Sequence, residues 1–302
     1  MTTAANGAVL GFAECREAAA ALAGELGIAL HEVVVRSFPD GESLVRVPSP
    51  VAETVLLYRP LDNPNAKLVE LILAAAAARD NGARRVVLVA PYLAYMRQDM
   101  AFHPGEAVSQ QVIGRLIASH FDGLIAIDPH LHRIDRLDEA VRGIPALSLS
   151  AAPVLSAAIV TAERPVLIGP DSESRPWVEA IARPLGLDVL VGEKQRNGDR
   201  DVELVIAGIE RVAGRPVVLV DDVISSGMTM IAAAGQSLLA GASGVEALAA
   251  HSLACAADLA RMKAAGIDRI RTTRSVNGPT ACLPVAALLA DAIRAQGWAS
   301  GA

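Results

Sequence analysis

Short apolar runs alternate along the chain with longer segments in which apolar residues recur every three or four positions. The short runs predict strands over residues 31–38, 53–59, 84–90, 123–128, 165–169, 187–192 and 215–222, and the run Val217–Val220 predicts a strand buried on both faces. The longer segments predict helices over residues 67–82, 107–121, 177–186, 228–241 and 256–266. Such alternation is typical of an α/β fold with a largely parallel sheet.

The two halves of the chain resemble each other. Residues 55–72 parallel residues 166–181, and residues 84–92 parallel residues 215–223. We therefore predict two similar domains in tandem, over residues 1–147 and 148–302, each a mostly parallel sheet flanked by helices. In this pairing Ala90 and Pro91 stand where the second half has Asp221 and Asp222. The pairing predicts that the second domain holds the polar site.

Composition narrows the class of protein. Although 52% of the 302 residues are hydrophobic, no apolar run approaches the roughly 18 residues that span a membrane. The N-terminus has no basic segment before an apolar core, so we expect no secretory signal. The three cysteines are far apart in sequence, which favours a reducing cytoplasm. A net charge of −6 with 3% aromatic residues argues against nucleic acid as a partner.

The most informative stretch is VVLVDDVISSGMTM, residues 217–230. A buried strand ends in two acids, Asp221 and Asp222, and a helix is predicted to follow. The connecting residues are small or carry hydroxyls except for one methionine: Ser225, Ser226, Gly227, Met228 and Thr229. Loops at the carboxyl ends of parallel strands bind ligands, and a helix N-terminus attracts anions. The acids and the anion site together suit a sugar phosphate, although an ordinary strand-to-helix connection with a serine N-cap is the alternative.

Two further segments could bind a nucleotide. Residues 37–47 contain Pro-Asp-Gly, which predicts a tight turn between two strands. In that turn Phe38 could stack on a base, and Asp40 or Glu42 could accept from an exocyclic amine; a plain hairpin is the alternative. Residues 91–109 follow a buried strand and carry Arg97, Gln98 and Asp99 in sequence. Arg97 suits a polyphosphate, whereas the alternative is a solvated loop.

Other segments offer metal ligands and cations. His130 follows one buried strand and Asp171 follows another, so either could face Mg²⁺ or its water shell, although a lone histidine is more often structural. Residues 192–204 predict a hairpin with Lys194 and Arg196 on one strand face. Both cations could then reach the same phosphates, or simply be solvated.

These motifs, in this order, resemble the ribose-phosphate pyrophosphokinases, also called PRPP synthetases, over about residues 31 to 292. They are Phe-Pro-Asp-Gly-Glu, Arg-Gln-Asp, Asp-x-His, the Pro-Asp that ends at residue 171, Lys-x-Arg and the Asp-Asp loop. The Pro-Gly-Glu-Ala-Val-Ser and Glu-Lys-x-Arg passages are similar to the short, archaeal-type members. The resemblance implies two phosphoribosyltransferase-like domains and the reaction of ATP with ribose 5-phosphate, which gives AMP and PRPP.

The resemblance also implies roles for residues. The 5-phosphate would lie on residues 225–229, with Asp221 and Asp222 on the ribose hydroxyls. Lys194 and Arg196 would stabilise the transferring diphosphoryl group, and His130 and Asp171 would be associated with Mg²⁺. Arg97, Gln98 and Asp99 would contact ATP. Phe38, Asp40 and Glu42 would contact adenine from a neighbouring subunit, so the resemblance implies a homo-oligomer, either a dimer or a hexamer.

Departures from the family pattern leave alternatives open. Ser225 stands where many members have Asp, although archaeal-type members tolerate Ser. Met228 stands where the family usually has Gly, and a side chain there could obstruct a positive-φ backbone or crowd the amides that bind the phosphate. Residues 172–175 replace a stretch that is often Gly-rich. A related enzyme with an altered sugar phosphate or nucleotide donor is therefore one alternative. A non-catalytic regulatory subunit is another, which the presence of Lys194, Arg196 and the acid pair disfavours.

Overall fold

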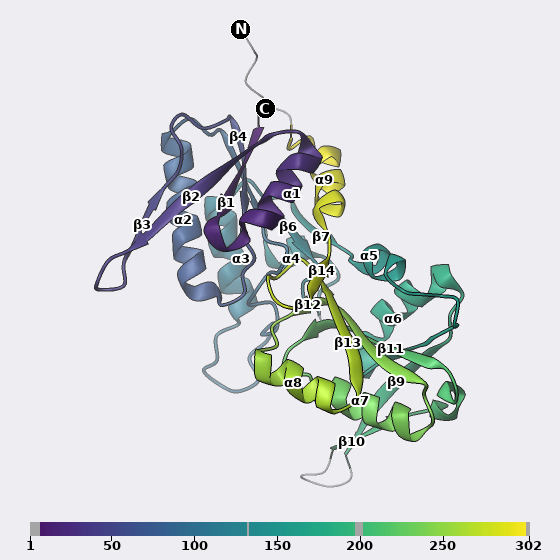
Figure 1. Ribbon diagram of the computed structural model, residues 1–302. Coiled ribbons are helices and arrows are strands. Elements are labelled where there is room, and N and C mark those ends of the chain that lie inside the picture. The colour runs from purple at the N-terminus through teal and green to yellow at the C-terminus, as the bar shows by residue number, and fades with distance from the viewer. Residues whose placement is uncertain (1–6, 132, 197–201, 300–302) are drawn as a thin grey trace. The chain divides into compact units, whose positions relative to one another are not determined.

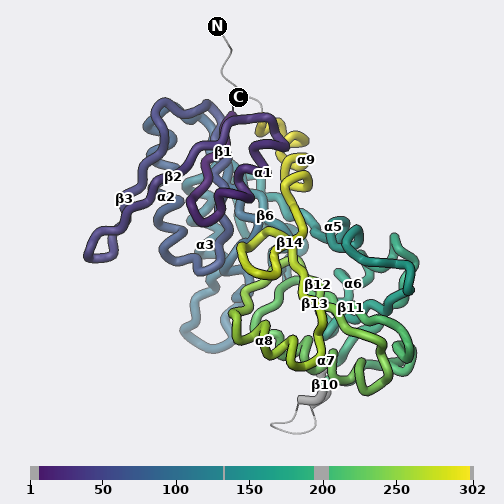
Figure 2. Tube along the Cα trace, in the orientation of Figure 1, coloured from purple at the N-terminus to yellow at the C-terminus, as the bar shows by residue number. Residues whose placement is uncertain are grey.

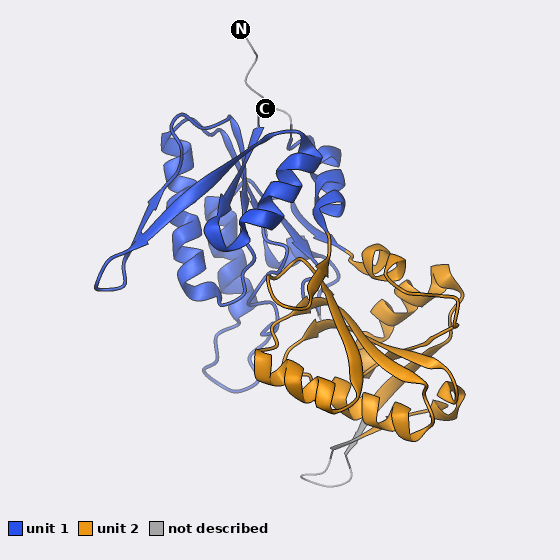
Figure 3. Ribbon diagram, in the orientation of Figure 1, with its two compact units in different colours: residues 1–149, 285–302 blue, residues 150–284 orange. Residues whose placement is uncertain are grey.

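The computed structural model describes residues 7–131, 133–196 and 202–299, without the side chains of residues 194–196, 202 and 203. The chain divides into two compact units (Figure 3). Unit 1 comprises residues 1–149 and 285–302, and unit 2 comprises residues 150–284. Among the described helices, none combines the length and the apolar character that a membrane span requires.

Unit 1 is built on a seven-stranded sheet with the order β3-β2-β1-β4-β5-β6-β7 (Figure 1). Every neighbouring pair is parallel except β2 and β3, which form an antiparallel hairpin. The strands are β1 (Gly7–Phe12), β2 (Ala29–Ser37), β3 (Ser43–Arg46), β4 (Thr54–Tyr58), β5 (Arg85–Val89), β6 (Gly123–Ile127) and β7 (Ala146–Leu149). The central strands are buried along their length because helices flank the sheet.

The helices of unit 1 follow the strands in the expected alternation. They are η1 (Ala13–Cys15), α1 (Arg16–Leu26), α2 (Pro64–Asp80), α3 (Ser109–His120), α4 (Leu137–Ala140) and the C-terminal α9 (Ala286–Ala295). Helix α1 ends at Gly27, which adopts the left-handed conformation that closes many helices. Helix α2 begins with Pro64. Proline suits this first position because an N–H group there would make no hydrogen bond within the helix.

Unit 2 has a second seven-stranded sheet, with the order β10-β9-β8-β11-β12-β13-β14. Here β9 and β10 are antiparallel, and the other neighbours are parallel. The strands are β8 (Val166–Gly169), β9 (Val189–Arg196), β10 (Val202–Ile206), β11 (Pro216–Ile224), β12 (Gly244–Ser252), β13 (Ile267–Thr273) and β14 (Ala281–Leu283). The two sheets confirm the predicted α/β class.

The helices of unit 2 are α5 (Ala152–Ala157), η2 (Ser172–Ser174), α6 (Arg175–Ala182), η3 (Arg183–Leu185), η4 (Ile209–Val212), α7 (Met228–Leu239) and α8 (Ala256–Ala264). Alternate residues of β11 and β12 pack with Met230 of α7 and Met262 of α8 in one apolar cluster. This cluster fixes the start of α7 at the carboxyl end of β11.

The identical strand orders confirm that the two units are repeats, but the sequence-based pairing was wrong. Position in the sheet makes β4 the counterpart of β11 and β5 the counterpart of β12. The sequence comparison had instead paired β4 with β8 and β5 with β11. The error arises because buried parallel strands are all short runs of Val, Leu and Ile, which align well in any pairing. The segment after β4, beginning at Arg59, is thus the counterpart of the Asp221–Asp222 segment.

The C-terminal segment returns to unit 1, whereas the predicted boundary assigned it to the second domain. Helix α9 lies beside α1, as the tube in Figure 2 shows, and Arg294 donates to the Glu25 carbonyl at the end of α1. Trp298 is 5% exposed, and its ring packs where a side chain on Gly123 of β6 would otherwise be. Burial of this indole explains why the last residues belong with the first sheet.

Candidate functional site

The loop between β11 and α7 has the geometry of an anion site. Ser225 and Ser226 are exposed, and α7 begins directly after Gly227. Gly227 is the N-cap and has no side chain with which to accept from the first turn of α7. The N–H groups of that turn therefore point toward the loop and its solvent, where an anion can accept from them.

Three carboxylates gather at the carboxyl ends of the neighbouring strands β8 and β11. Asp222 is buried and Asp221 is half-buried, and the Asp222 N–H donates to Asp221 Oδ1 at 3.0 Å. Burial, followed by the negative charges of Asp222 and Asp171, raises the pKa of Asp221 to about 8. Such a cluster favours a cation or a donor of several hydroxyl groups between its members.

In this loop Gly227 adopts the positive φ, and Met228 already has the helical conformation of α7. Gly227 has φ of +73°, and a Cβ there would lie 2.5 Å from Met262 Sδ. Met228 is the first residue of the helix, and its side chain is 57% exposed. The concern that Met228 occupies a positive-φ position is therefore wrong, because glycine already holds that position one residue earlier.

Asp171 is held by its own turn. Its side chain accepts from the Ser174 N–H at 3.3 Å, which caps η2 directly after β8. The side chain of Ser174 occupies the space beside Gly169, where an added Cβ would lie 2.3 Å from the serine hydroxyl. Arg175 pairs with Glu179 one helical turn later, with 3.6 Å between Nη1 and Oε1. Residues 172–175 thus form a well-capped turn that keeps Asp171 at the sheet edge.

Lys194 and Arg196 lie on the last part of β9, in the predicted hairpin. Their backbones pair with Leu204 and Val202 of β10. Their side chains, and the connecting residues 197–201, lie outside the described part of the structure.

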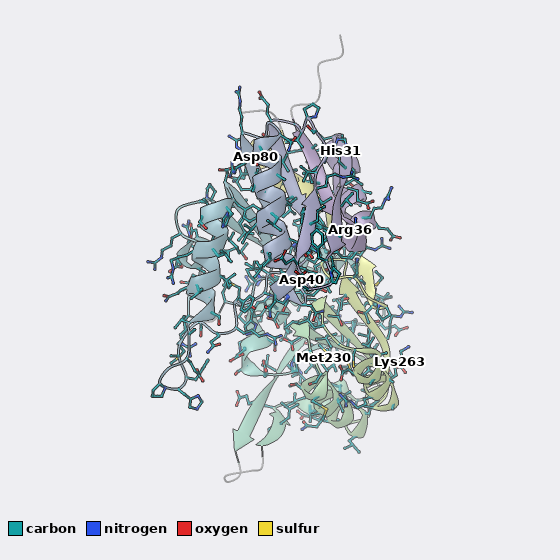
Figure 4. The ribbon with its side chains drawn as sticks, turned by 90° about the vertical axis from the view of Figure 1, so that its left-hand side faces the viewer. His31, Arg36, Asp40, Asp80, Met230 and Lys263 are labelled. Carbon is teal, nitrogen blue, oxygen red and sulfur yellow. The ribbon has the colours of Figure 1, made fainter. Side chains whose placement is uncertain are left out.

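In unit 1 the predicted Pro-Asp-Gly turn connects β2 and β3. Phe38 donates its N–H to the Glu42 carbonyl at 2.7 Å, and Asp40 Oδ1 accepts from the Glu42 N–H at 3.1 Å. The Phe38 side chain is 42% exposed, and the two acids are also exposed. Figure 4 labels His31, Arg36 and Asp40 in succession along this hairpin toward its tip. The structure thus brings the three predicted adenine contacts together on one turn.

The loop after β5 uses two of its three predicted ATP contacts internally. Gln98 donates to Glu106 at 3.3 Å and accepts from Ser109 Oγ at 3.4 Å. The Asp99 side chain is only 2% exposed, and its Oδ1 accepts from Arg133 Nη1 at 2.6 Å. Arg97, by contrast, is exposed to solvent. Arg97 is therefore the member of this motif that reaches a ligand without breaking an existing bond.

The carboxylates of unit 2 suit a magnesium ion that arrives with a nucleotide. His130 is half-buried just beyond β6 in unit 1, and Asp171 lies beside Asp221 in unit 2. No group of three histidine, cysteine or acidic residues with metal-site geometry occurs within the residues that the structure describes. Mg²⁺ commonly binds one or two carboxylates, keeps several waters and takes phosphate oxygens. The mutually repelling carboxylates of unit 2 are compatible with that mode of binding.

Sequence reasoning missed several polar residues near these segments. Arg133, which neutralises Asp99, gave no signal beyond its place in the His130 loop. His251 of β12 is buried opposite Val223 of β11, and its Nδ1 lies 2.6 Å from Ser275 Oγ. Ser275 Oγ also lies 3.0 Å from the Ala250 carbonyl oxygen, to which it can donate. An unusually polar end of an otherwise apolar strand was the signal for His251.

Comparisons with known proteins agree with this geometry. Residues 8–120 match the family model for the N-terminal domain of ribose phosphate pyrophosphokinase, and residues 150–271 match the phosphoribosyl transferase domain. The ribose-phosphate pyrophosphokinase of Methanopyrus kandleri is 36% identical over 276 residues, covering 90% of this chain and 93% of that protein. The corresponding protein of Methanothermobacter thermautotrophicus is 31% identical, with 95% and 99% covered.

A solved structure shows the same fold. The phosphoribosylpyrophosphate synthetase of Mycobacterium smegmatis has a TM-score of 0.83 and 26% identity, covering 97% of this chain and 99% of that one. The relatives and this structure match both units, in the same order along the chain. The two sheets, each with an antiparallel hairpin at one edge, and the acid pair of β11 agree with these matches. The chain belongs to the ribose-phosphate pyrophosphokinase family.

Proposed function

We propose that the chain transfers the β,γ-diphosphoryl group of ATP to the O1 hydroxyl of ribose 5-phosphate. O1 attacks the β-phosphorus, the bond from that phosphorus to the α,β-bridging oxygen breaks, and AMP leaves with the bridging oxygen. The O1 proton passes to solvent, and the second product is PRPP. The observation that carries this proposal is the carboxyl end of β11, where the half-buried Asp221 and the buried Asp222 precede hydroxyl groups and a helix N-terminus.

The proposed sugar site uses each part of that loop. The 5-phosphate accepts from the first-turn N–H groups of α7 and from the hydroxyls of Ser225, Ser226 and Thr229, beside Gly227 and Met228. The carboxylates of Asp221 and Asp222 accept from the vicinal ribose hydroxyls, which accounts for two acids so close together. This arrangement orients O1 toward the diphosphoryl donor, and orientation is a large part of phosphoryl-transfer catalysis.

Lys194 and Arg196 are the proposed catalytic residues. Both would contact oxygens of the transferring diphosphoryl group, from one face of the β9–β10 hairpin. Their charges stabilise the transition state more than the ground state if they meet the phosphates only when the hairpin is in place. An electrostatic contact of this kind contributes several kcal/mol, or about 10²-fold or more in rate.

The proposed ATP site lies on unit 1. Phe38 stacks on adenine, Asp40 and Glu42 accept from its amine, and Arg97 binds the polyphosphate beside Gln98 and Asp99. Following the resemblance, a neighbouring subunit presents the Phe38 turn, so the active form is a homo-oligomer, a dimer or a hexamer. Asp171 in unit 2 and His130 in unit 1 are the residues proposed to be associated with Mg²⁺, which would supply charge neutralisation when bound. We also propose a cytoplasmic location, which suits the free thiols of Cys15, Cys255 and Cys282.

A coupled assay with ATP, Mg²⁺ and ribose 5-phosphate tests this proposal. Wild-type protein should form AMP and PRPP. Lys194→Ala should lower the rate of PRPP formation by about 10²-fold or more and leave the melting temperature unchanged. Lys263→Ala is the matched control, because Lys263 is exposed in the last turn of α8 (Figure 4). Equal activity in the two variants would remove the catalytic role of Lys194. No PRPP from wild type with any pentose phosphate would overturn the proposed reaction.

A further inference from the structure

Arg59 occupies, in unit 1, the place that the acid pair occupies in unit 2. β4 and β11 have the same position in the two strand orders, and Arg59 directly follows β4. In unit 2 the corresponding segment opens into the loop assigned to the sugar phosphate. In unit 1 the Arg59 side chain is only 7% exposed, so the chain fills the equivalent place with its own atoms.

Arg59 is the centre of a buried charge network. Its Nε donates to Glu14 Oε1 at 2.7 Å, and its Nη1 forms an ion pair with Glu70 Oε2 at 2.6 Å. The guanidinium also lies 3.8 Å from the centroid of the Phe12 ring at the end of β1. These contacts join the ends of β1 and β4 to helix α2, and the planar guanidinium suits several simultaneous partners.

The second oxygen of Glu70 continues the network into the β2–β3 hairpin. Ser43 Oγ donates to Glu70 Oε1 at 3.0 Å. Ser43 is the first residue of β3, pairs with Ser37 across the hairpin and directly follows Glu42. The carboxylate of Glu70 therefore connects the buried arginine to the base of the turn that carries Phe38, Asp40 and Glu42.

The hairpin needs such a connection because one of its faces is open. Val34 is 38% exposed and Leu44 is 42% exposed, so apolar packing holds the hairpin from one side. Among the described residues, the hairpin beyond Val33 has only two strands, because β1 pairs with residues 29–33 of β2 and β3 pairs with residues 34–37; two strands by themselves are marginally stable in water. The Ser43–Glu70 hydrogen bond lies on the opposite face, toward α2. Its loss would leave the tip free to tilt.

We propose that Arg59 is a positioning residue for ATP binding, which acts through Glu70 and Ser43 to fix the orientation of the Phe38–Glu42 turn. This inference rests on the proposed function, in which that turn holds adenine. A purely stabilising role explains the network less well, because burial of an ion pair costs about as much desolvation energy as the attraction returns. Fixing a geometry is the role that we infer here, because each Glu70 oxygen has a partner of its own.

Ser43→Ala tests the inference without disturbing the buried pair. The Arg59–Glu70 contact remains, so the variant should fold with a melting temperature close to wild type. We expect the KM for ATP to rise about fivefold, the ratio that corresponds to one hydrogen bond of about 1 kcal/mol. The kcat and the KM for ribose 5-phosphate should stay within about twofold. Ser43→Thr keeps the hydroxyl and should restore the KM for ATP.

Arg59→Met extends the test, with Arg16→Met as its control. Arg16 Nη1 lies 2.9 Å from Glu32 Oε2 on the same hairpin, but the two side chains are 71% and 43% exposed. We expect Arg59→Met to raise the KM for ATP by about tenfold or more, and Arg16→Met to leave it unchanged. An increase of the same size in the control would show that any charge near the hairpin matters, and would overturn the inference.

Two measurements that do not depend on catalysis, hydrogen exchange and nucleotide binding, distinguish this inference from the proposed reaction. Hydrogen exchange of the Phe38, Gly41 and Glu42 amides, which are hydrogen-bonded within the turn, should be faster in Ser43→Ala than in wild type. Binding of a fluorescent ATP analogue should weaken in parallel. Unchanged exchange and binding in Ser43→Ala would overturn the positioning role. Absence of PRPP from wild type, with these two effects present, would instead refute only the reaction.

Discussion

Gly227→Ala should damage both folding and sugar-phosphate binding, because two independent costs fall on this one residue. Its φ of +73° is a left-handed conformation that costs an alanine about 1–2 kcal/mol. The new Cβ would also lie 2.5 Å from Sδ and 2.8 Å from Cγ of Met262, a fully buried side chain. Overpacking of this kind costs about 1–3 kcal/mol, so the sum is about 2–5 kcal/mol.

The same substitution eight residues later in the chain is the control. Gly235 lies inside α7, and a Cβ there meets nothing within 4 Å. Alanine should stabilise the helix at that site by about 0.5–1 kcal/mol. The two variants therefore shift unfolding in opposite directions, although they change the composition identically.

Chemical denaturation and steady-state kinetics measure the two consequences. Gly227→Ala should unfold at lower denaturant, and its KM for ribose 5-phosphate should rise about tenfold or more as the α7 amides move. Since each charge-assisted hydrogen bond contributes about 1.5–3 kcal/mol, the loss of one accounts for that factor. If Gly227→Ala matched Gly235→Ala in stability and in KM, the proposed loop geometry would be refuted.

Three further predictions concern residues outside that loop. Burial raises the pKa of the Cys15 thiol to about 11, so the folded state keeps a proton that the unfolded state loses above about pH 8.5–9. Stability should therefore fall by about 2 kcal/mol between pH 9 and 11, and Cys15→Ala should flatten that part of the profile; a parallel profile would contradict the assignment. Met228→Gly should change the KM for ribose 5-phosphate by less than about twofold, because the Met228 side chain is exposed and its backbone is helical; a large improvement in kinetics would show that methionine obstructs the site. Arg133→Met leaves the buried Asp99 carboxylate without its charged partner and should lower the free energy of unfolding by about 1–3 kcal/mol, while Arg136→Met, which removes an exposed pair, should not; equal effects in calorimetry would exclude the Asp99 contact as the cause.

Sequence predicted the strands that are continuous apolar runs, but burial alone did not decide the outcome, because the predicted β2 is largely exposed and the fully buried β1 was missed. β4, β5, β6 and β11 are continuous apolar runs because both faces of each strand are covered. β1 was missed since glycines interrupt its apolar run, and the fold requires one of them. A Cβ on Gly11 would lie 2.7 Å from the Cβ of Ala19 in α1. β12 was missed because its alanines have the composition of a helix, although tertiary pairing makes the segment a strand.

The candidate site was predictable where the chemistry is local. The β11 loop and the Phe38 turn are each a short run of residues, so their geometry follows from neighbours in sequence. The partners of Asp99 and Arg59 come from elements far along the chain, and no local pattern reports such contacts. The pairing of repeats failed for a related reason, since strand composition reflects burial and carries little information about position in the sheet.

Product analysis with ATP labelled at the β-phosphorus tests the central claim most directly. The proposed reaction places the label in a sugar diphosphate and leaves unlabelled AMP, with the two products in equal amounts and both dependent on ribose 5-phosphate. Release of labelled ADP, with a single phosphoryl group on the sugar, would contradict diphosphoryl transfer and identify an ordinary phosphotransfer instead.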